Sequence, residues 1–295
     1  MIWLILLAIA YLFYAVVFIL DKYILTRPMP DPVVYAFWVC FLGIFVLGLV
    51  PIFGFSLPSS QEVFWSLIAG VSQLVGLILF YRALNKSEVS RLVPFVGAIS
   101  AVFILILNSI SIHEFLTGKQ IIAFIILVFG SLVIGFRKKE FFGNGILAPA
   151  LISSFLFAVF WVITKYLFLG TDFVSGLVWV RIGVAIISLF LLFSKKNRQA
   201  IFSKIKETKL KTTGFFMLGR GLNVVGSLFF YGAVFLGSVT LANALQGLQY
   251  VFVLILALLL FKKIPDLKEQ FSKEYLIQKI TAIVLICTGL FILLI

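Results

Sequence analysis

Long, unbroken runs of apolar residues follow one another along the chain, separated by short polar connections. Each run is close to the roughly 20 residues that a helix needs to cross a hydrocarbon core, and none shows the strict alternation that is typical of strands. The pattern predicts ten membrane-spanning helices at residues 2–20, 33–52, 63–84, 89–110, 119–136, 145–168, 173–193, 212–236, 239–261 and 276–295. The one long polar connection, 195–211, is expected to be a partly helical surface segment.

Composition supports an all-α polytopic membrane protein. Hydrophobic residues make up 63% of the chain and charged residues only 12%, whereas about a quarter of the residues of a soluble domain are charged. Cys40 and Cys287 both fall within spans, so a disulfide framework is not expected. The sequence contains no phosphate-binding Gly-Lys-Ser/Thr loop, no metal-ligand spacing and no nucleophile elbow. We therefore expect neither enzymatic activity nor a cofactor or metal.

The net charge of +13 does not indicate a nucleic-acid partner, because of where the charges lie. Twenty of the 24 Lys and Arg residues fall in the connections that follow odd-numbered spans. Basic connections remain cytoplasmic, so these connections are expected inside the cell and both termini outside, in the inner or plasma membrane. Lys119 and Lys165 are the exceptions on the opposite face, and Arg181 and Arg220 lie within spans.

The chain contains an internal repeat. Residues 12–25 align without a gap on residues 155–168, and Ala15, Lys22 and Tyr23 recur at the same spacing in the second segment. The repeat divides the chain into two five-helix halves, 1–139 and 140–295. Because five is odd, matching helices must run in opposite directions, so the halves are inverted relative to each other. Two such halves are typical of secondary transporters, whose substrate site lies near the midplane between them.

Two local features are similar to a known family. The stretch from Phe80-Tyr81-Arg82-Ala83-Leu84 to Pro94, and the turn His113-Glu114-Phe115-Leu116-Thr117, resemble conserved segments of EamA-type permeases in the drug/metabolite transporter superfamily. The second half departs from the pattern, with Lys263-Ile264-Pro265 at the position of the Glu turn and Ala244 at the position of Pro94. The resemblance implies a cavity formed mainly by spans 1, 3, 4, 6, 8 and 9.

The repeat and the resemblance together predict a permease that moves small organic metabolites by alternating access. Amino-acid-like or other anionic or zwitterionic solutes are the expected substrates, and the lipid bilayer is the expected surroundings. The alternatives are a flippase of lipid-linked carriers and a structural membrane protein. Association into a homodimer is left open.

Two arginines inside spans are candidates for recognising an anionic group. An ionisable residue within the bilayer is costly and so indicates function, and a guanidinium can bind a carboxylate in bidentate fashion. Arg220 lies within span 8 with Asn223 on the same helix face, and Gln73 is the copy of Asn223 in span 3. Arg181 lies within span 7 and is a secondary candidate. Either arginine could instead bond helix carbonyls or extend to the interface.

Span 9 carries Asn243, Gln246, Gln249 and Tyr250 at steps of three and four, which place them on one stripe of a helix. These side chains are expected to line the cavity or to hold neighbouring helices together. None of the eleven acidic residues lies near a span centre. A proton-coupled exporter of cationic drugs is therefore not indicated.

Three further residues are candidates for gating. Lys22 and Lys165 are copies at the ends of spans 1 and 6, where each could either extend to the interface or meet a partner when its own side is closed. Pro94 removes a backbone hydrogen bond within span 4 and is expected to kink it.

Overall fold

The structure, a computed structural model, describes residues 2–24, 31–87, 89–135, 145–207, 210–260 and 273–294. Within these ranges the regular structure is entirely helical. In chain order the elements are α1 (Ile2–Ile24), α2 (Pro32–Phe41), η1 (Leu42–Leu49), α3 (Val50–Phe53), α4 (Ser60–Leu84), α5 (Val89–Ser111), α6 (Gly118–Gly135), α8 (Leu147–Gly170), α9 (Phe173–Leu189), η2 (Phe190–Phe193), α10 (Lys195–Glu207), α11 (Leu210–Leu236), α12 (Val239–Ala244), α13 (Gly247–Leu260) and α14 (Lys273–Leu294).

The predicted spans coincide with these helices. Span 2 is the continuous run of α2, η1 and α3; span 7 is α9 with η2; span 9 is divided into α12 and α13. In the described part of the chain, seven segments are long and apolar enough to cross a membrane, and α6 and α14 contain two shorter apolar helices. The protein is therefore a multi-pass, all-helical membrane protein. The predicted surface helix within 195–211 is present as α10.

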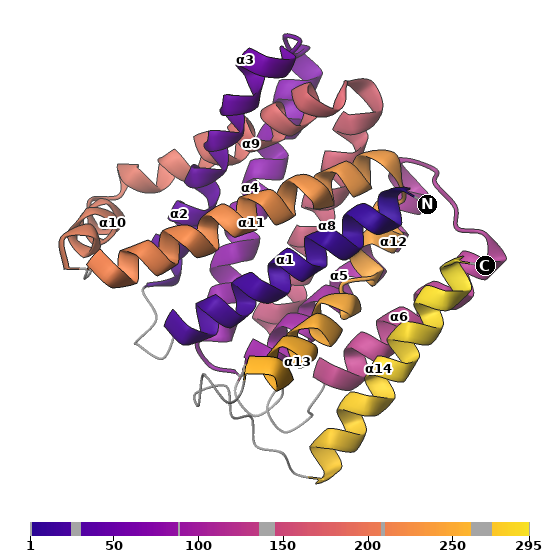
Figure 1. The fold of residues 1–295 in the computed structure, drawn as a ribbon. Helices are drawn as coiled ribbons and strands as arrows, with labels where there is room; N and C mark the ends of the chain where they lie inside the picture. Colours follow the sequence, from indigo (N-terminus) through magenta and orange to yellow (C-terminus); the bar gives the residue numbers. More distant parts are fainter. Residues whose placement is uncertain are drawn as a thin grey trace.

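Helices from the two predicted halves pack against each other in matching pairs (Figure 1). α1 packs along α11, and its sequence copy α8 packs along α4. α1 also contacts α13, as α8 contacts α5, while α6 and α14 lie side by side. The central helices are thus those of spans 1, 3, 4, 6, 8 and 9.

The two copied helices α1 and α8 run in opposite directions. α1 begins beside the end of α11, where the ring of Trp3 packs directly on Gly237. α8 ends at the same place, since Lys165 Nζ donates a hydrogen bond to the Gly237 carbonyl. The start of one copy therefore lies next to the end of the other, as the inverted repeat requires.

One crossing between α4 and α9 depends on glycine. A Cβ atom at Gly70 would lie 2.5 Å from the carbonyl oxygen of Gly183, and a Cβ at Gly183 would collide with the backbone of Ser66. Small residues let helix backbones approach closely in membranes, where packing replaces the hydrophobic effect as the source of helix association. This contact fixes α9 on the outside of α4.

Copied aspartates begin two of the helices. Asp31 accepts a hydrogen bond from the backbone N–H of Val33 at the start of α2, and Asp172 accepts from Val174 and Ser175 at the start of α9. The side chains satisfy N–H groups that have no partner within the helix. Hydrogen bonds from Ser175 hold the pKa of the Asp172 carboxyl below its usual value.

We predict that Asp172→Ala lowers the free energy of unfolding by about 1 kcal/mol, because α9 loses its N-cap. The Asp172→Asn variant keeps the accepting oxygen and should lose less. Since the folded pKa is depressed, the stabilisation by Asp172 is complete above the ordinary carboxyl pKa of about 3.9 and disappears as the pH falls through the lowered value. Unfolding in detergent at pH 7 and at pH 3 measures both effects; an equal deficit at the two pH values would contradict the role of the carboxylate.

Candidate functional site

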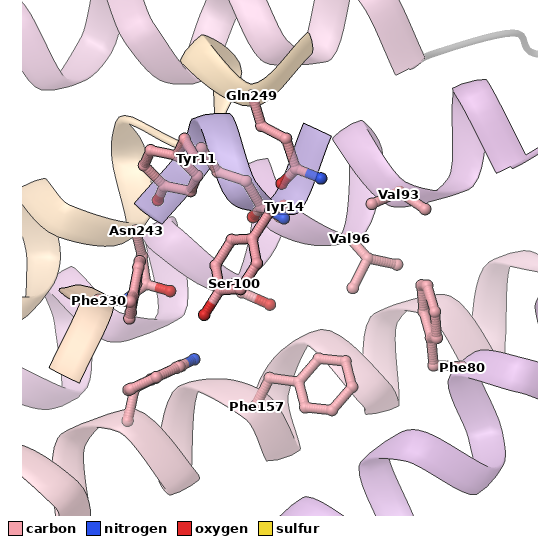
Figure 2. A pocket seen from close by; sticks show the side chains of 13 residues that line it. Tyr11, Tyr14, Phe80, Val93, Val96, Ser100, Phe157, Phe230, Asn243 and Gln249 are labelled. Atoms are coloured by element: carbon pink, nitrogen blue, oxygen red, sulfur yellow. The ribbon is translucent and has the colours of Figure 1, made fainter. Parts of the chain in front are cut away.

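A cavity of about 170 Å³ lies where α1, α4, α5, α8, α11 and the α12–α13 junction meet (Figure 2). These are the six spans that the family resemblance implied. The cavity is lined by aromatic rings, by polar side chains without formal charge, and by a small aliphatic patch. The lining residues are Tyr11, Tyr14, Phe80, Val93, Val96, Gly97, Ser100, Phe157, Trp161, Phe230, Asn243, Gln246 and Gln249.

Four aromatic rings form one continuous wall. The ring centroid of Phe230 lies 4.7 Å from that of Trp161 and 5.7 Å from that of Tyr11, and Tyr14 lies 6.2 Å from both Tyr11 and Phe230. The Tyr11 hydroxyl donates to the Ala242 carbonyl at 2.6 Å, which ties α1 to α12. Because the rings meet edge-to-face or at tilted angles, the wall presents both ring faces and ring edges to the cavity. An apolar group can pack against it, and a cation can bind over a ring face.

The amides of the cavity come from an interruption of span 9. α12 ends at Ala244 and α13 begins at Gly247; between them the N–H of Gln246 donates to the Asn243 carbonyl at 3.1 Å in a three-residue turn. Non-helical backbone is tolerated at membrane depth only where it is buried in protein or faces a cavity. The turn therefore brings the side chains of Asn243, Gln246 and Gln249 to the cavity.

Gln249 presents a side-chain amide to the cavity. Its side chain is only 8% exposed and points into the cavity in Figure 2. Its amide forms no hydrogen bond with another described residue, whereas the Asn243 amide nitrogen donates to the Val239 carbonyl at 2.9 Å. A buried amide normally has partners, so we expect a solute or water to bind Gln249.

Gln246 packs directly against the backbone of α5. A Cβ atom at Gly97 would collide with its amide group, so a larger residue at this position of α5 would displace the end of the Gln246 side chain. Pro94 lies one turn earlier on the same helix, between the lining residues Val93 and Val96. The Val96 carbonyl accepts a hydrogen bond from Ser154 of α8 at 3.2 Å, which holds α5 against α8 beside the cavity.

The other predicted substrate contacts lie away from this cavity. The Arg220 guanidinium lies over the ring of Tyr35 of α2, 5.7 Å from its centroid. Gln73 and Asn223 are half-buried on α4 and α11 and are not among the lining residues. Tyr250 is 9% exposed and does not line the cavity. Of the seven predicted contacts, the structure brings Asn243, Gln246 and Gln249 together.

The predicted gating residues occupy different places. Arg181 of α9 lies over the ring of Tyr231, 4.9 Å from its centroid, and against Gly43 of η1. Lys165 is buried and bonded to backbone carbonyls at the end of α11. Lys22 lies near the end of α1, and its side chain is outside the described residues.

Sequence reasoning did not identify which residues form the aromatic lining, because nothing in the composition distinguishes them among the 34 Phe residues of the chain. The internal repeat contained a signal that could have identified it. Tyr14 and Phe157 are copies at a spacing of 143 residues, Phe80 and Phe230 are copies at a spacing of 150, and all four line the cavity. An aromatic residue that recurs on the same face of both copies points to the surface between them.

The N-terminal part of the chain matches a known family. The sequence model of the EamA-like transporter family matches residues 1–136. These residues belong to the EamA-like transporter family. The resemblance to EamA-type permeases is thereby confirmed for this part of the chain, and the matched family is one of membrane transporters of small molecules that are not enzymes.

The whole fold is also present among solved structures. One crystal structure aligns over 98% of this chain and 94% of its own, with a TM-score of 0.64 and 15% identity. At that identity the likeness concerns the fold alone. No curated protein matches the sequence.

We predict that Gly97→Ala lowers the free energy of unfolding by about 1 kcal/mol, because the new methyl group must displace the flexible end of the Gln246 side chain from α5. Gly232→Ala on α11 is the matched control, since a Cβ there would meet Leu6 at an ordinary 3.5 Å. Equilibrium unfolding in mixed micelles measures both variants, and equal effects would contradict the tight contact between Gly97 and Gln246.

Proposed function

We propose that this EamA-like transporter carries small zwitterionic solutes of the amino-acid type through the cavity by alternating access. The observation that carries the proposal is the uncharged lining: none of the 13 residues around the cavity is Lys, Arg, Asp or Glu. A net charge placed there would lose its hydration without gaining a counter-ion, which is costly. A zwitterion brings its own compensating charge.

The two sides of the cavity suit the two ends of such a solute. The aromatic wall of Tyr11, Tyr14, Trp161 and Phe230 would receive the ammonium group through cation–π contacts. The carboxylate would accept hydrogen bonds from the side-chain amide of Gln249, which has no other partner among the described residues. The apolar side chain would lie toward the aliphatic patch on α5.

Alternating access is supported by the position of the cavity between helices of both predicted halves, since either end could open while the binding groups remain in place. Basic connections, including α10, are placed in the cytoplasm by their charge. A flippase of lipid-linked carriers fits less well, because the lining provides no cation for a phosphate group.

The proposal can be tested by counterflow in proteoliposomes loaded with an unlabelled neutral amino acid that has an apolar side chain. We expect the labelled zwitterion to accumulate, while its methyl ester, which is a cation, and its N-acetyl derivative, which is an anion, do not. Accumulation of either charged derivative without the zwitterion would overturn the proposal.

We predict that Gln249→Leu raises the KM for the transported solute at least tenfold while leaving the protein folded, because the variant keeps the volume but removes the hydrogen-bond donor. Gln73→Leu is the matched control, since Gln73 lies on α4 away from the cavity. Should Gln73→Leu alter the KM as strongly as Gln249→Leu, the cavity would not be the binding site.

Arg220 provides a separate prediction. Because its guanidinium lies over Tyr35 and not at the cavity, we expect Arg220→Gln to lower the thermal stability and the maximal transport rate with little change in KM. A large rise in KM with unchanged stability would instead place Arg220 in direct contact with the solute. Counterflow kinetics and thermal unfolding of the same preparation separate the two results.

A further inference from the structure

Lys165 makes an unusual contact for a lysine near the end of a membrane helix. Its side chain is 7% exposed, and Nζ donates hydrogen bonds to the carbonyls of Val234 at 2.9 Å, Phe235 at 3.4 Å and Gly237 at 2.7 Å. A lysine at this depth would ordinarily extend its ammonium to the interface. Here the ammonium points inward, to a neighbouring helix.

The three carbonyls belong to the last turn of α11 and the residue after it. Carbonyls at a helix C-terminus have no partner within the helix, and the helix dipole makes this end negative. An ammonium group carries three donors and a positive charge. Lys165 therefore both donates hydrogen bonds to these carbonyls and compensates the negative end of the helix dipole. The contact joins α8 to the point where α11 turns into α12.

The position of this turn determines where α12 lies. Ser238 follows directly and begins α12, its hydroxyl accepting from the N–H of Leu241. All six residues of α12 are buried, and the helix leads to Asn243 at the cavity. α12 is held on its other sides by Tyr11 of α1, through Ala242, and by Asn108 of α5.

The contact between α12 and Asn108 of α5, on the opposite side, is incompletely hydrogen-bonded. Its amide nitrogen donates to the Thr240 hydroxyl at 3.3 Å and to Glu114 at 3.0 Å. Its amide oxygen is buried and has no hydrogen-bond partner among the described residues, which is an energetic cost. Lys165 therefore adds a charged contact at an end of α12 where a neighbouring amide is incompletely satisfied.

The end of α4 is the counterpart of the end of α11 in the first half. There the Ala83 carbonyl accepts from the Ser87 hydroxyl at 3.1 Å and from the Lys86 backbone N–H at 3.0 Å. The Leu84 carbonyl accepts from the Ser87 backbone N–H. These contacts come from the turn that follows α4, and the side chain of Lys22, the copy of Lys165, lies outside the described residues.

We propose that Lys165 is a positioning residue of the transport cycle: its ammonium holds the α11–α12 turn so that α12 closes the cavity at the end of the bundle where α8 ends, and its release lets α12 withdraw. The proposal rests on the transporter function proposed above, but not on the identity of the solute. Loss of Lys165 should therefore expose the cavity from that end.

The test measures access to the cavity without any substrate. A Ser100→Cys reporter, in a background with Cys40→Ala and Cys287→Ala, places one thiol at the cavity wall. A membrane-impermeant maleimide is then applied separately to each face of sealed vesicles. We expect Lys165→Met to raise the labelling rate from the face where α8 ends at least tenfold, while Lys165→Arg keeps the low rate of the reporter parent.

Two further variants make the result decisive. Lys119→Met removes an exposed lysine at the start of α6, at the same end of the bundle, and should leave the labelling rate unchanged. Gly237→Ala crowds the Trp3 ring at the α11–α12 turn without touching Lys165, and should also raise the rate. The proposal would be overturned if Lys165→Met or Gly237→Ala folds, has a lower melting temperature, and is labelled at the same rate as the reporter parent. Lys165 would then be a simple helix cap.

The outcome is independent of the solute experiment. Failure of zwitterion counterflow would remove the proposed substrate class and leave the labelling result unaffected. Unchanged labelling with intact counterflow would remove the role of Lys165 and leave the proposed function in place.

Discussion

Backbone N–H and C=O groups that lose their helical partner inside a bilayer must form hydrogen bonds elsewhere in the protein, because the hydrocarbon offers none. Two features to which a function is proposed here lie where that requirement interrupts a helix. Span 9 is broken between Ala244 and Gly247, and the break faces the cavity. α11 ends inside the bundle, and Lys165 satisfies its carbonyls. In uninterrupted helices such as α6 and α14, the interior backbone groups are hydrogen-bonded within the helix, so these helices need no such partners and can act as a rigid scaffold.

The same requirement explains how much of the fold could be predicted from the sequence. The spans were predictable because each apolar run must be a helix, and the inverted repeat indicated their directions. The division of span 9 was not predictable from its apolar pattern, which continues through Gln246. Its polar stripe was a partial signal: the spacing correctly grouped Asn243, Gln246 and Gln249, but the turn at 245–246 rotates the following residues, and Tyr250 leaves the cavity surface.

The candidate site was harder to predict than the fold. A charged residue within a membrane span is rare and so indicates function, whereas an aromatic residue there is common. Arg220 was expected at the cavity because burying a guanidinium is costly, yet a ring can reduce that cost as well as a solute can, and Tyr35 does so. Among so many Phe residues, composition cannot show which rings face inward. That depends on the rotation of each helix, which is set by packing contacts such as Gly97 against Gln246.

The two copies also contribute different kinds of side chain to the cavity, so that one of its sides is apolar and another is polar. Val93 and Val96 on α5 correspond, at the spacing of 150 residues, to Asn243 and Gln246 of the second half, and all four line the cavity. One copy thus contributes an aliphatic surface and the other contributes amides. A solute with a polar and an apolar end would then keep one orientation at the site. Because the polar side is built on α12 and α13, the opening movement proposed above would also move the groups proposed to hold the solute, so binding and opening would be linked through the same short helix.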